Sequence, residues 1–114
     1  MSYYSTIGGR LRVKSARGMA ILHRHFDDWT DPQAEGQVKF GDSAVDFNGY
    51  YRNLGRRLEP CLSELHRMGE LADVNVNEVT SDGFEGEFHY ELLDGRPFVT
   101  VREPSGGIEE RRAL

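Results

Sequence analysis

The fold is decided by residues 87–102, which read EFHYELLDGRPFVTVR. Apolar and polar side chains alternate on both sides of Asp94-Gly95, a dipeptide that favours a two-residue hairpin turn. With this turn, Tyr90 lies opposite Val99 and Phe88 opposite Val101, and these apolar pairs share one face. Because the turn and the alternation agree, the sequence predicts an antiparallel hairpin that buries one face.

The segment before this hairpin carries a second alternating pattern, which contains Val74 and Val76. A two-residue turn at Asp82-Gly83 would place asparagines, not these valines, on the core face. A three-residue loop at 81–83 instead pairs Val76 with Phe88 and keeps the valines in the core. Because a one-residue slip moves every side chain to the other face, we expect the three-residue loop and this pairing.

Apolar spacing predicts four more elements earlier in the chain. They are a strand, a helix, a short hairpin and a second helix, at residues 5–14, about 16–29, 38–47 and about 54–68. Pro60 lies inside the second helical pattern, so that helix is either kinked there or begins near Glu59. Gly69 is the expected end of this helix, because glycine readily adopts the left-handed conformation that follows a helix.

The order of elements is strand, helix, two strands, helix and three strands, which predicts an α+β fold with a mostly antiparallel sheet. The first six elements match a ferredoxin-like βαββαβ core, to which the last strands add a C-terminal hairpin. Both helices would cover one face of the sheet and leave the other open to solvent or a partner. We expect one domain over residues 1–103 and a flexible tail over residues 104–114.

Composition narrows the class of protein. The chain has 114 residues, a net charge of −5 and a single cysteine, so it fits one globular domain and forms no internal disulfide. A net acidic chain is poorly suited to non-specific nucleic-acid binding. The longest apolar run, residues 19–22, is far shorter than a membrane span, and the first residues do not resemble a signal peptide. We therefore expect a cytoplasmic protein without membrane association and, since phosphate-binding loops are absent, without a cofactor.

Three features together resemble a known group of proteins. They are the aromatic stretch Phe47-Asn48-Gly49-Tyr50-Tyr51, the helix through Met68, and the acidic strand from Glu85 that ends at Leu93-Asp94-Gly95. This combination resembles small phage and bacterial proteins that have no settled function. Twelve of the fourteen basic residues are arginines, a bias that favours a GC-rich coding genome. The resemblance implies the same fold and a phage-related origin, and it transfers no active site to this chain.

Two motifs before residue 70 are candidates for chemistry. His23 and Asp27 have a spacing that can chelate a metal on a helix, and His25, Asp28 and Asp31 lie nearby. A solvated helix end is the simpler interpretation, so no metal site is predicted. Cys61 is close to His66, as in cysteine nucleophiles, but it falls on the apolar seam, where a free cysteine behaves as a buried hydrophobe.

A third motif lies on the strand that begins the hairpin. Glu85, Glu87, His89 and Glu91 line one strand face, where two carboxylates around a histidine could perform acid–base work. An ordinary solvent-facing strand is the simpler interpretation. No catalytic residue is therefore predicted.

The open sheet face is the predicted binding surface. Its candidate residues come from the first strand and from the C-terminal hairpin: Arg10, Arg12, Glu87, His89 and Arg102. The leading hypothesis is a non-enzymatic interaction module, such as a phage accessory protein, that binds a protein partner or a second copy of itself. The first alternative is a small-ligand-binding domain or minor enzyme that uses the acidic and histidine row. The second is a single-stranded nucleic-acid binder that uses the basic first strand.

Overall fold

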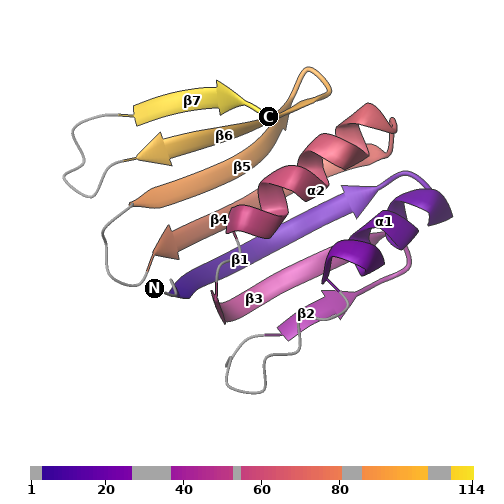
Figure 1. The fold of residues 1–114 in the computed structure, drawn as a ribbon, viewed down its shortest axis with the longest axis horizontal. Coiled ribbons are helices and arrows are strands. Elements are labelled where there is room, and N and C mark those ends of the chain that lie inside the picture. Colours follow the sequence, from indigo (N-terminus) through magenta and orange to yellow (C-terminus); the bar gives the residue numbers. More distant parts are fainter. Residues whose placement is uncertain (1–3, 27–36, 53–54, 81–85, 103–108) are drawn as a thin grey trace.

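A computed structural model describes residues 4–26, 37–52, 55–80, 86–102 and 109–114 of the chain. The elements are, in chain order, β1 Tyr4–Val13, α1 Ala16–Phe26, β2 Gln37–Phe40, β3 Ala44–Arg52, α2 Gly55–Arg67, β4 Leu71–Thr80, β5 Glu87–Leu93, β6 Arg96–Arg102 and β7 Glu109–Ala113. All strands of these segments form one antiparallel sheet in the order β2-β3-β1-β4-β5-β6-β7 (Figure 1). The fold class is α+β, as the sequence predicts.

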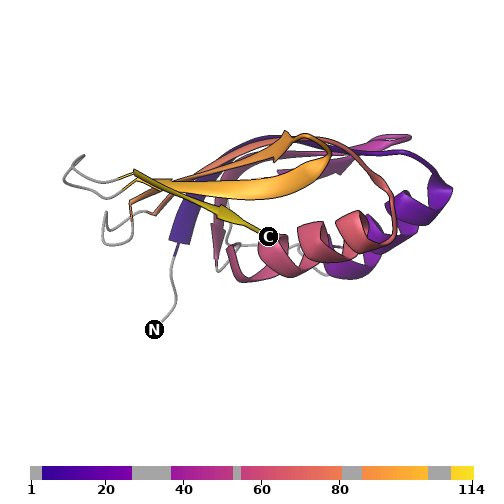
Figure 2. The same ribbon diagram turned by 90° about the horizontal axis from the view of Figure 1, so that it is seen from above.

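The core fills the space between the two helices and one face of the sheet. Figure 2 shows α1 and α2 side by side on the same face. Leu11 of β1, Leu22 of α1 and Leu65 of α2 are each 0% exposed there. Phe26 and Phe47 meet edge to face with ring centroids 5.3 Å apart, a favoured aromatic geometry. The apolar stripes of both helices therefore pack against this one face of the sheet.

The C-terminal hairpin has the predicted register. Tyr90 lies opposite Val99, and the pairing continues to the ends of β5 and β6. Asp94 has φ +52° and Gly95 has φ +78°, so both turn residues adopt the left-handed conformation that a type I′ turn requires. The smaller hairpin also forms as expected, with Val38 opposite Phe47.

The pairing of β4 with β5 differs from the sequence prediction by two residues. Val76 lies opposite Tyr90, not Phe88, and Glu78 takes the place opposite Phe88. The valines still face the core, because a shift of two residues leaves every side chain on the same face. The hydrophobic pattern therefore determines the face but not this register. The expected loop, 81–83, falls outside the described residues.

Glu78 is buried by this register. It is 4% exposed, and the Tyr90 hydroxyl donates a hydrogen bond to its carboxylate at 3.3 Å. Burial and the neighbouring Glu78 carboxylate raise the pKa of Tyr90 far above its ordinary value. The Tyr90 hydroxyl therefore stays protonated and serves as a hydrogen-bond donor inside the core.

Both helices form where their apolar spacing predicts them. α1 is described as far as Phe26, and the last residues of the expected helix, 27–29, lie outside the described part of the chain. α2 begins at Gly55, so Pro60 lies inside the helix, and the alternative start near Glu59 is wrong. Neither helix is long and apolar enough to cross a membrane, and the same holds for every helix in the described segments.

β7 occupies part of the segment that was expected to be a tail. Glu109–Ala113 pairs antiparallel with β6, and all five residues are exposed. Arg112 also forms an ion pair with Glu59 of α2 at 2.8 Å. This strand has no buried side of its own to produce an apolar alternation, so backbone pairing and ion pairs hold it in place. Sequence periodicity therefore gives no sign of it.

Gly9 allows β1 and β4 to approach closely at the centre of the sheet. Its φ is +136°, and a Cβ built at this position would lie 2.1 Å from the Asn75 carbonyl oxygen and 2.7 Å from the Val76 Cα. Both neighbours are backbone atoms, which cannot rotate away. At the adjacent Gly8, a Cβ would meet nothing within 4 Å. Gly8 and Gly9 are therefore adjacent glycines of one strand, of which only Gly8 has space for a Cβ.

We predict that Gly9→Ala destabilises the fold and that Gly8→Ala does not. Backbone strain and overpacking should together cost Gly9→Ala at least about 2 kcal/mol. Gly8→Ala should stay within about 0.5 kcal/mol of the wild type. Urea unfolding followed by circular dichroism measures both. Equal stability of the two variants would show that β1 and β4 are not this close.

Glu70 joins the end of α2 to the start of α1. Gly69, with φ +70°, ends α2, and the Glu70 N–H donates to the Leu65 carbonyl at 2.9 Å, as in many glycine-terminated helices. The Glu70 carboxylate accepts a hydrogen bond from the Ser15 hydroxyl at 2.7 Å and pairs with Arg17 at 3.4 Å. The Ser15 bond outweighs the opposing desolvation and, with Arg17, lowers the pKa of Glu70.

We predict that Glu70→Gln lowers stability at pH 7 and has less effect at pH 3. The pKa of Glu70 is lower in the folded chain than its ordinary value of 4.5. Its stabilising contribution is therefore present above about pH 4.5 and is lost as the pH falls through the folded-state pKa. Urea unfolding at both pH values measures the gap between variant and wild type. Glu110→Gln, on the exposed β7, is the control, and a gap of equal size at both pH values would contradict this role.

Candidate functional site

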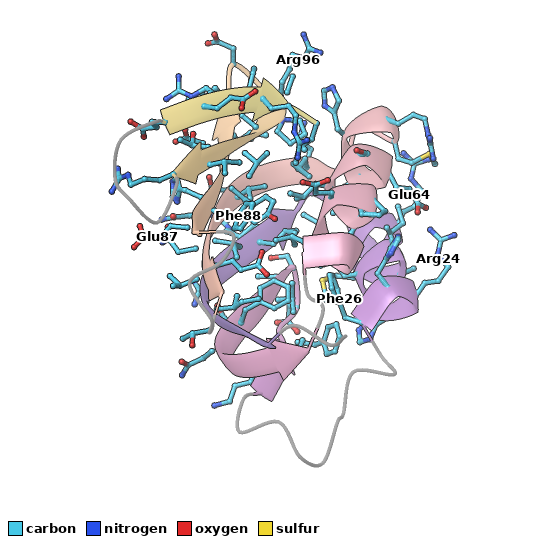
Figure 3. All side chains as sticks on the ribbon, turned by 60° about the vertical axis from the view of Figure 1, so that its left-hand side comes forward. Arg24, Phe26, Glu64, Glu87, Phe88 and Arg96 are labelled. Carbon is cyan, nitrogen blue, oxygen red and sulfur yellow. The ribbon has the colours of Figure 1, made fainter. Side chains whose placement is uncertain are left out.

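The open face is the side of the sheet that points away from α1 and α2. Side chains alternate between the two faces along each strand, and Figure 3 shows Glu87 pointing away from the helices. The adjacent Phe88 packs against the core instead. The same alternation, relative to the buried Leu11, Tyr90 and Val99, puts every predicted binding residue on the open face. These residues are Arg10, Arg12, Glu87, His89 and Arg102.

The open face has a hollow of about 410 Å³ over β4 to β7, which we call the β4–β7 hollow. Three of the predicted residues line it, namely Glu87, His89 and Arg102. Two rows of side chains cross the hollow, each running from β5 through β6 to β7. His89 lies opposite Thr100, which lies opposite Arg111, and Glu87 lies opposite Arg102, which lies opposite Glu109.

One chain of polar contacts crosses the hollow through His89. The Asn77 side-chain oxygen lies 2.7 Å from His89 Nδ1, so Nδ1 is the nitrogen that donates. His89 Nε2 lies 3.6 Å from a Glu91 carboxylate oxygen, and the other Glu91 oxygen lies 3.6 Å from the Arg111 guanidinium. Asn77 thus fixes the orientation of the imidazole, while the contacts on its other side are longer than good hydrogen bonds.

A second set of contacts centres on Arg102. Its guanidinium lies 3.9 Å from Glu87 and 3.6 Å from Glu109, and all three side chains are more than half exposed. Exposed ion pairs of this length add little stability and are readily rearranged. The charged groups at this rim can therefore exchange their contacts for those of a bound molecule.

Thr100 forms the floor of the hollow between these two sets. It is 9% exposed, and its hydroxyl oxygen has no hydrogen-bond partner among the residues that the structure describes. Its neighbours across the strands are His89 and Arg111. A buried hydroxyl without a partner is unfavourable by about 1–3 kcal/mol. The base of the hollow therefore holds a hydroxyl group whose hydrogen-bonding capacity is not satisfied by the described residues.

The other two predicted residues, Arg10 and Arg12, lie elsewhere on the open face. They line a broader hollow of about 560 Å³ beside Asp46 and Asp73. Arg10 Nε donates to Asp46 at 2.6 Å, and this contact raises the pKa of Arg10. β4 separates β1 from β5 in the sheet. The five predicted residues therefore share a face but form two groups.

The histidines of α1 make separate contacts. His23 stacks on Phe40 with ring centroids 4.0 Å apart, and His25 Nε2 lies 3.0 Å from Glu64 of α2. Arg24 also pairs with Glu64 on the helix layer (Figure 3). The three aspartates of the candidate metal motif, Asp27, Asp28 and Asp31, fall outside the described residues. Within the described segments, no three His, Cys, Asp or Glu residues form a group that could hold a metal ion.

Cys61 points into the core. It is 0% exposed, and burial raises the pKa of its thiol to about 12. The nucleophile in cysteine chemistry is the thiolate, which is scarce at neutral pH for such a group. This position matches the interpretation of Cys61 as a buried hydrophobe rather than as a partner of His66.

Sequence reasoning missed several residues of the β4–β7 hollow, among them Thr100, Glu109 and Arg111. Thr100 gives no signal of its own, because threonine is common on strands. Glu109 and Arg111 belong to β7, which lacks apolar periodicity. Only the pairing of His89 with Thr100, predicted from the Asp94-Gly95 turn, could have pointed to this floor.

Comparison with known proteins identifies no relative. No protein-family model, no curated protein and no solved structure matches the chain.

Proposed function

We propose that the chain is a protein-interaction module that binds its partner through the open face, at the β4–β7 hollow. The observation that carries this proposal is the exposed, loosely paired charge around the buried Thr100 hydroxyl, which has no hydrogen-bond partner in the described part of the chain. Rearrangeable rim charges favour specificity and fast association with a complementary surface. A buried polar group at the centre gives such a surface a place to anchor.

The shape of the molecule supports a protein as the partner. It measures 40 × 36 × 19 Å, so the sheet is broad and the molecule thin. A standard protein interface occupies about 800 Å² on each partner, and a face with these two longer dimensions is large enough for it. The opposite face is covered by α1 and α2, which leaves the open face as the broad uncovered strand surface.

Charge pairing favours a protein over a nucleic acid. Arg10 is bound to Asp46, and Arg102 lies between Glu87 and Glu109. Phosphate contacts to these arginines would have to displace carboxylates that already neutralise them. A protein surface with both charges can instead complement the arginines and the carboxylates together.

We also propose that the first six elements form a ferredoxin-like core. The strand order β2-β3-β1-β4 supports this assignment, and so does the antiparallel pairing of each neighbouring pair in it. In this arrangement β5, β6 and β7 extend the sheet on the β4 side. The hollow would then be built on the extension rather than on the core.

We predict that exchanging the charges of Glu87 and Arg102 abolishes partner binding without affecting folding. The double variant Glu87→Arg/Arg102→Glu keeps the net charge and an opposite-charge pair but inverts the potential at the rim. Its control is Glu59→Arg/Arg112→Glu, an ion pair with an equally exposed arginine that joins α2 to β7 on the covered side. Thermal melting checks that both variants fold.

The measurement is affinity capture from nuclease-treated lysate of a GC-rich bacterium, quantified by mass spectrometry. A protein captured in stoichiometric amount by the wild type and the control, and reduced at least tenfold by the Glu87/Arg102 variant, is the expected result. Capture that survives the Glu87/Arg102 exchange but fails with the control would place the interface on the covered side and contradict the proposal.

A further inference from the structure

We infer that the β4–β7 hollow receives a lysine side chain of the protein partner, with its ammonium group at Thr100. This inference rests on the proposed function and deepens it by naming the group that anchors the partner. Three features of the hollow carry it, namely its excess of carboxylates, its unpaired floor hydroxyl and its apolar wall.

The hollow contains more negative than positive charge on its open-face side chains. Among the described residues that line it, carboxylates of Glu87, Glu91 and Glu109 face two guanidinium groups, those of Arg102 and Arg111. The formal balance of these five side chains is one negative charge. A cation entering the hollow therefore restores neutrality, whereas an anion would add to the imbalance.

The floor of the hollow suits an ammonium group better than a guanidinium group. Thr100 offers a single, recessed acceptor oxygen. An ammonium is a compact charge with three donors and no acceptor, so one donor can reach Thr100 while the others face the rim carboxylates. A guanidinium is planar and needs two acceptors side by side, which one hydroxyl oxygen does not provide.

An apolar wall completes the match to lysine. Val79 is 42% exposed and lines the hollow beside Glu87. It is one of two large hydrophobic side chains that are exposed in the described part of the chain, the other being Met68. Lysine buries its methylene stem on apolar surface and keeps its charged end among polar groups. Val79 thus offers a contact for the stem, and Thr100 and the carboxylates offer one for the head.

The first test uses n-butylammonium as a probe for the lysine side chain. It is titrated into the ¹⁵N-labelled full chain at constant ionic strength, and amide shifts are followed by NMR. We expect saturable shifts at Thr100, His89 and Val79, and we expect none with butyrate or tetramethylammonium. Uniform, non-saturating shifts, or binding of butyrate instead, would overturn the inference.

Two variants separate specific binding from general electrostatics. Thr100→Val preserves volume and β-branching while removing the floor acceptor, and it should raise the Kd for n-butylammonium at least threefold. Asp46→Asn, which removes a carboxylate from the other group on the open face, should leave the Kd unchanged. Equal Kd values for the wild type and Thr100→Val would show that Thr100 does not bind the probe.

The second test concerns the source of the ammonium group. Acetylating the lysines of the captured partner should reduce its capture at least tenfold. If capture stays sensitive to the Glu87/Arg102 exchange but is unaffected by acetylation, the lysine inference fails and the proposed function stands. If n-butylammonium binds but no partner is captured, the proposed function fails, and a partner lysine is excluded as the occupant.

Discussion

Two helices cover one face of a seven-stranded sheet, and this one-sided burial governs the rest of the structure. The buried apolar residues of β1, β4, β5 and β6 point toward α1 and α2, where the core excludes water. Their neighbours along each strand must then point to the open face. The backbone hydrogen bonds of the sheet are satisfied on both sides of β1, at the centre, where Gly9 gives β4 the space to approach. The core thus holds the strands in place, and the side chains of the open face do not belong to it.

This separation explains how the open face can carry a site that adds little to stability. The ion pairs of Arg102 are long and exposed, and the hydroxyl of Thr100 is buried without a partner among the described residues. On the covered side, by contrast, Glu70 is held by close contacts from Ser15 and Arg17. Polar groups that serve the fold are satisfied internally, whereas those around the β4–β7 hollow are left with capacity for another molecule.

Local signals predicted the elements and faces, but they did not predict every register. Asp94-Gly95 determines the β5–β6 pairing because a two-residue turn allows one alignment. The connection between β4 and β5 has no such restriction, so period-two alternation left an ambiguity of two residues, and Val76 pairs with Tyr90. The sequence did not predict β7, because all of its side chains are exposed and therefore show no apolar alternation. Three residues of the candidate site, Glu87, His89 and Arg102, followed from strand alternation and one turn, whereas the proposed role of Thr100 depends on neighbours that only the folded sheet brings together.

Hydroxyl-radical footprinting of the chain, free and bound to its captured partner, tests the central claim most directly. It reports the solvent exposure of individual side chains, and Val79 and Met68 are two exposed apolar residues in different parts of the fold. We expect binding to protect Val79 and His89 while the oxidation of Met68, which follows α2, stays unchanged. Protection of Met68 with unchanged oxidation of Val79 and His89 would place the partner away from the open face and contradict the account.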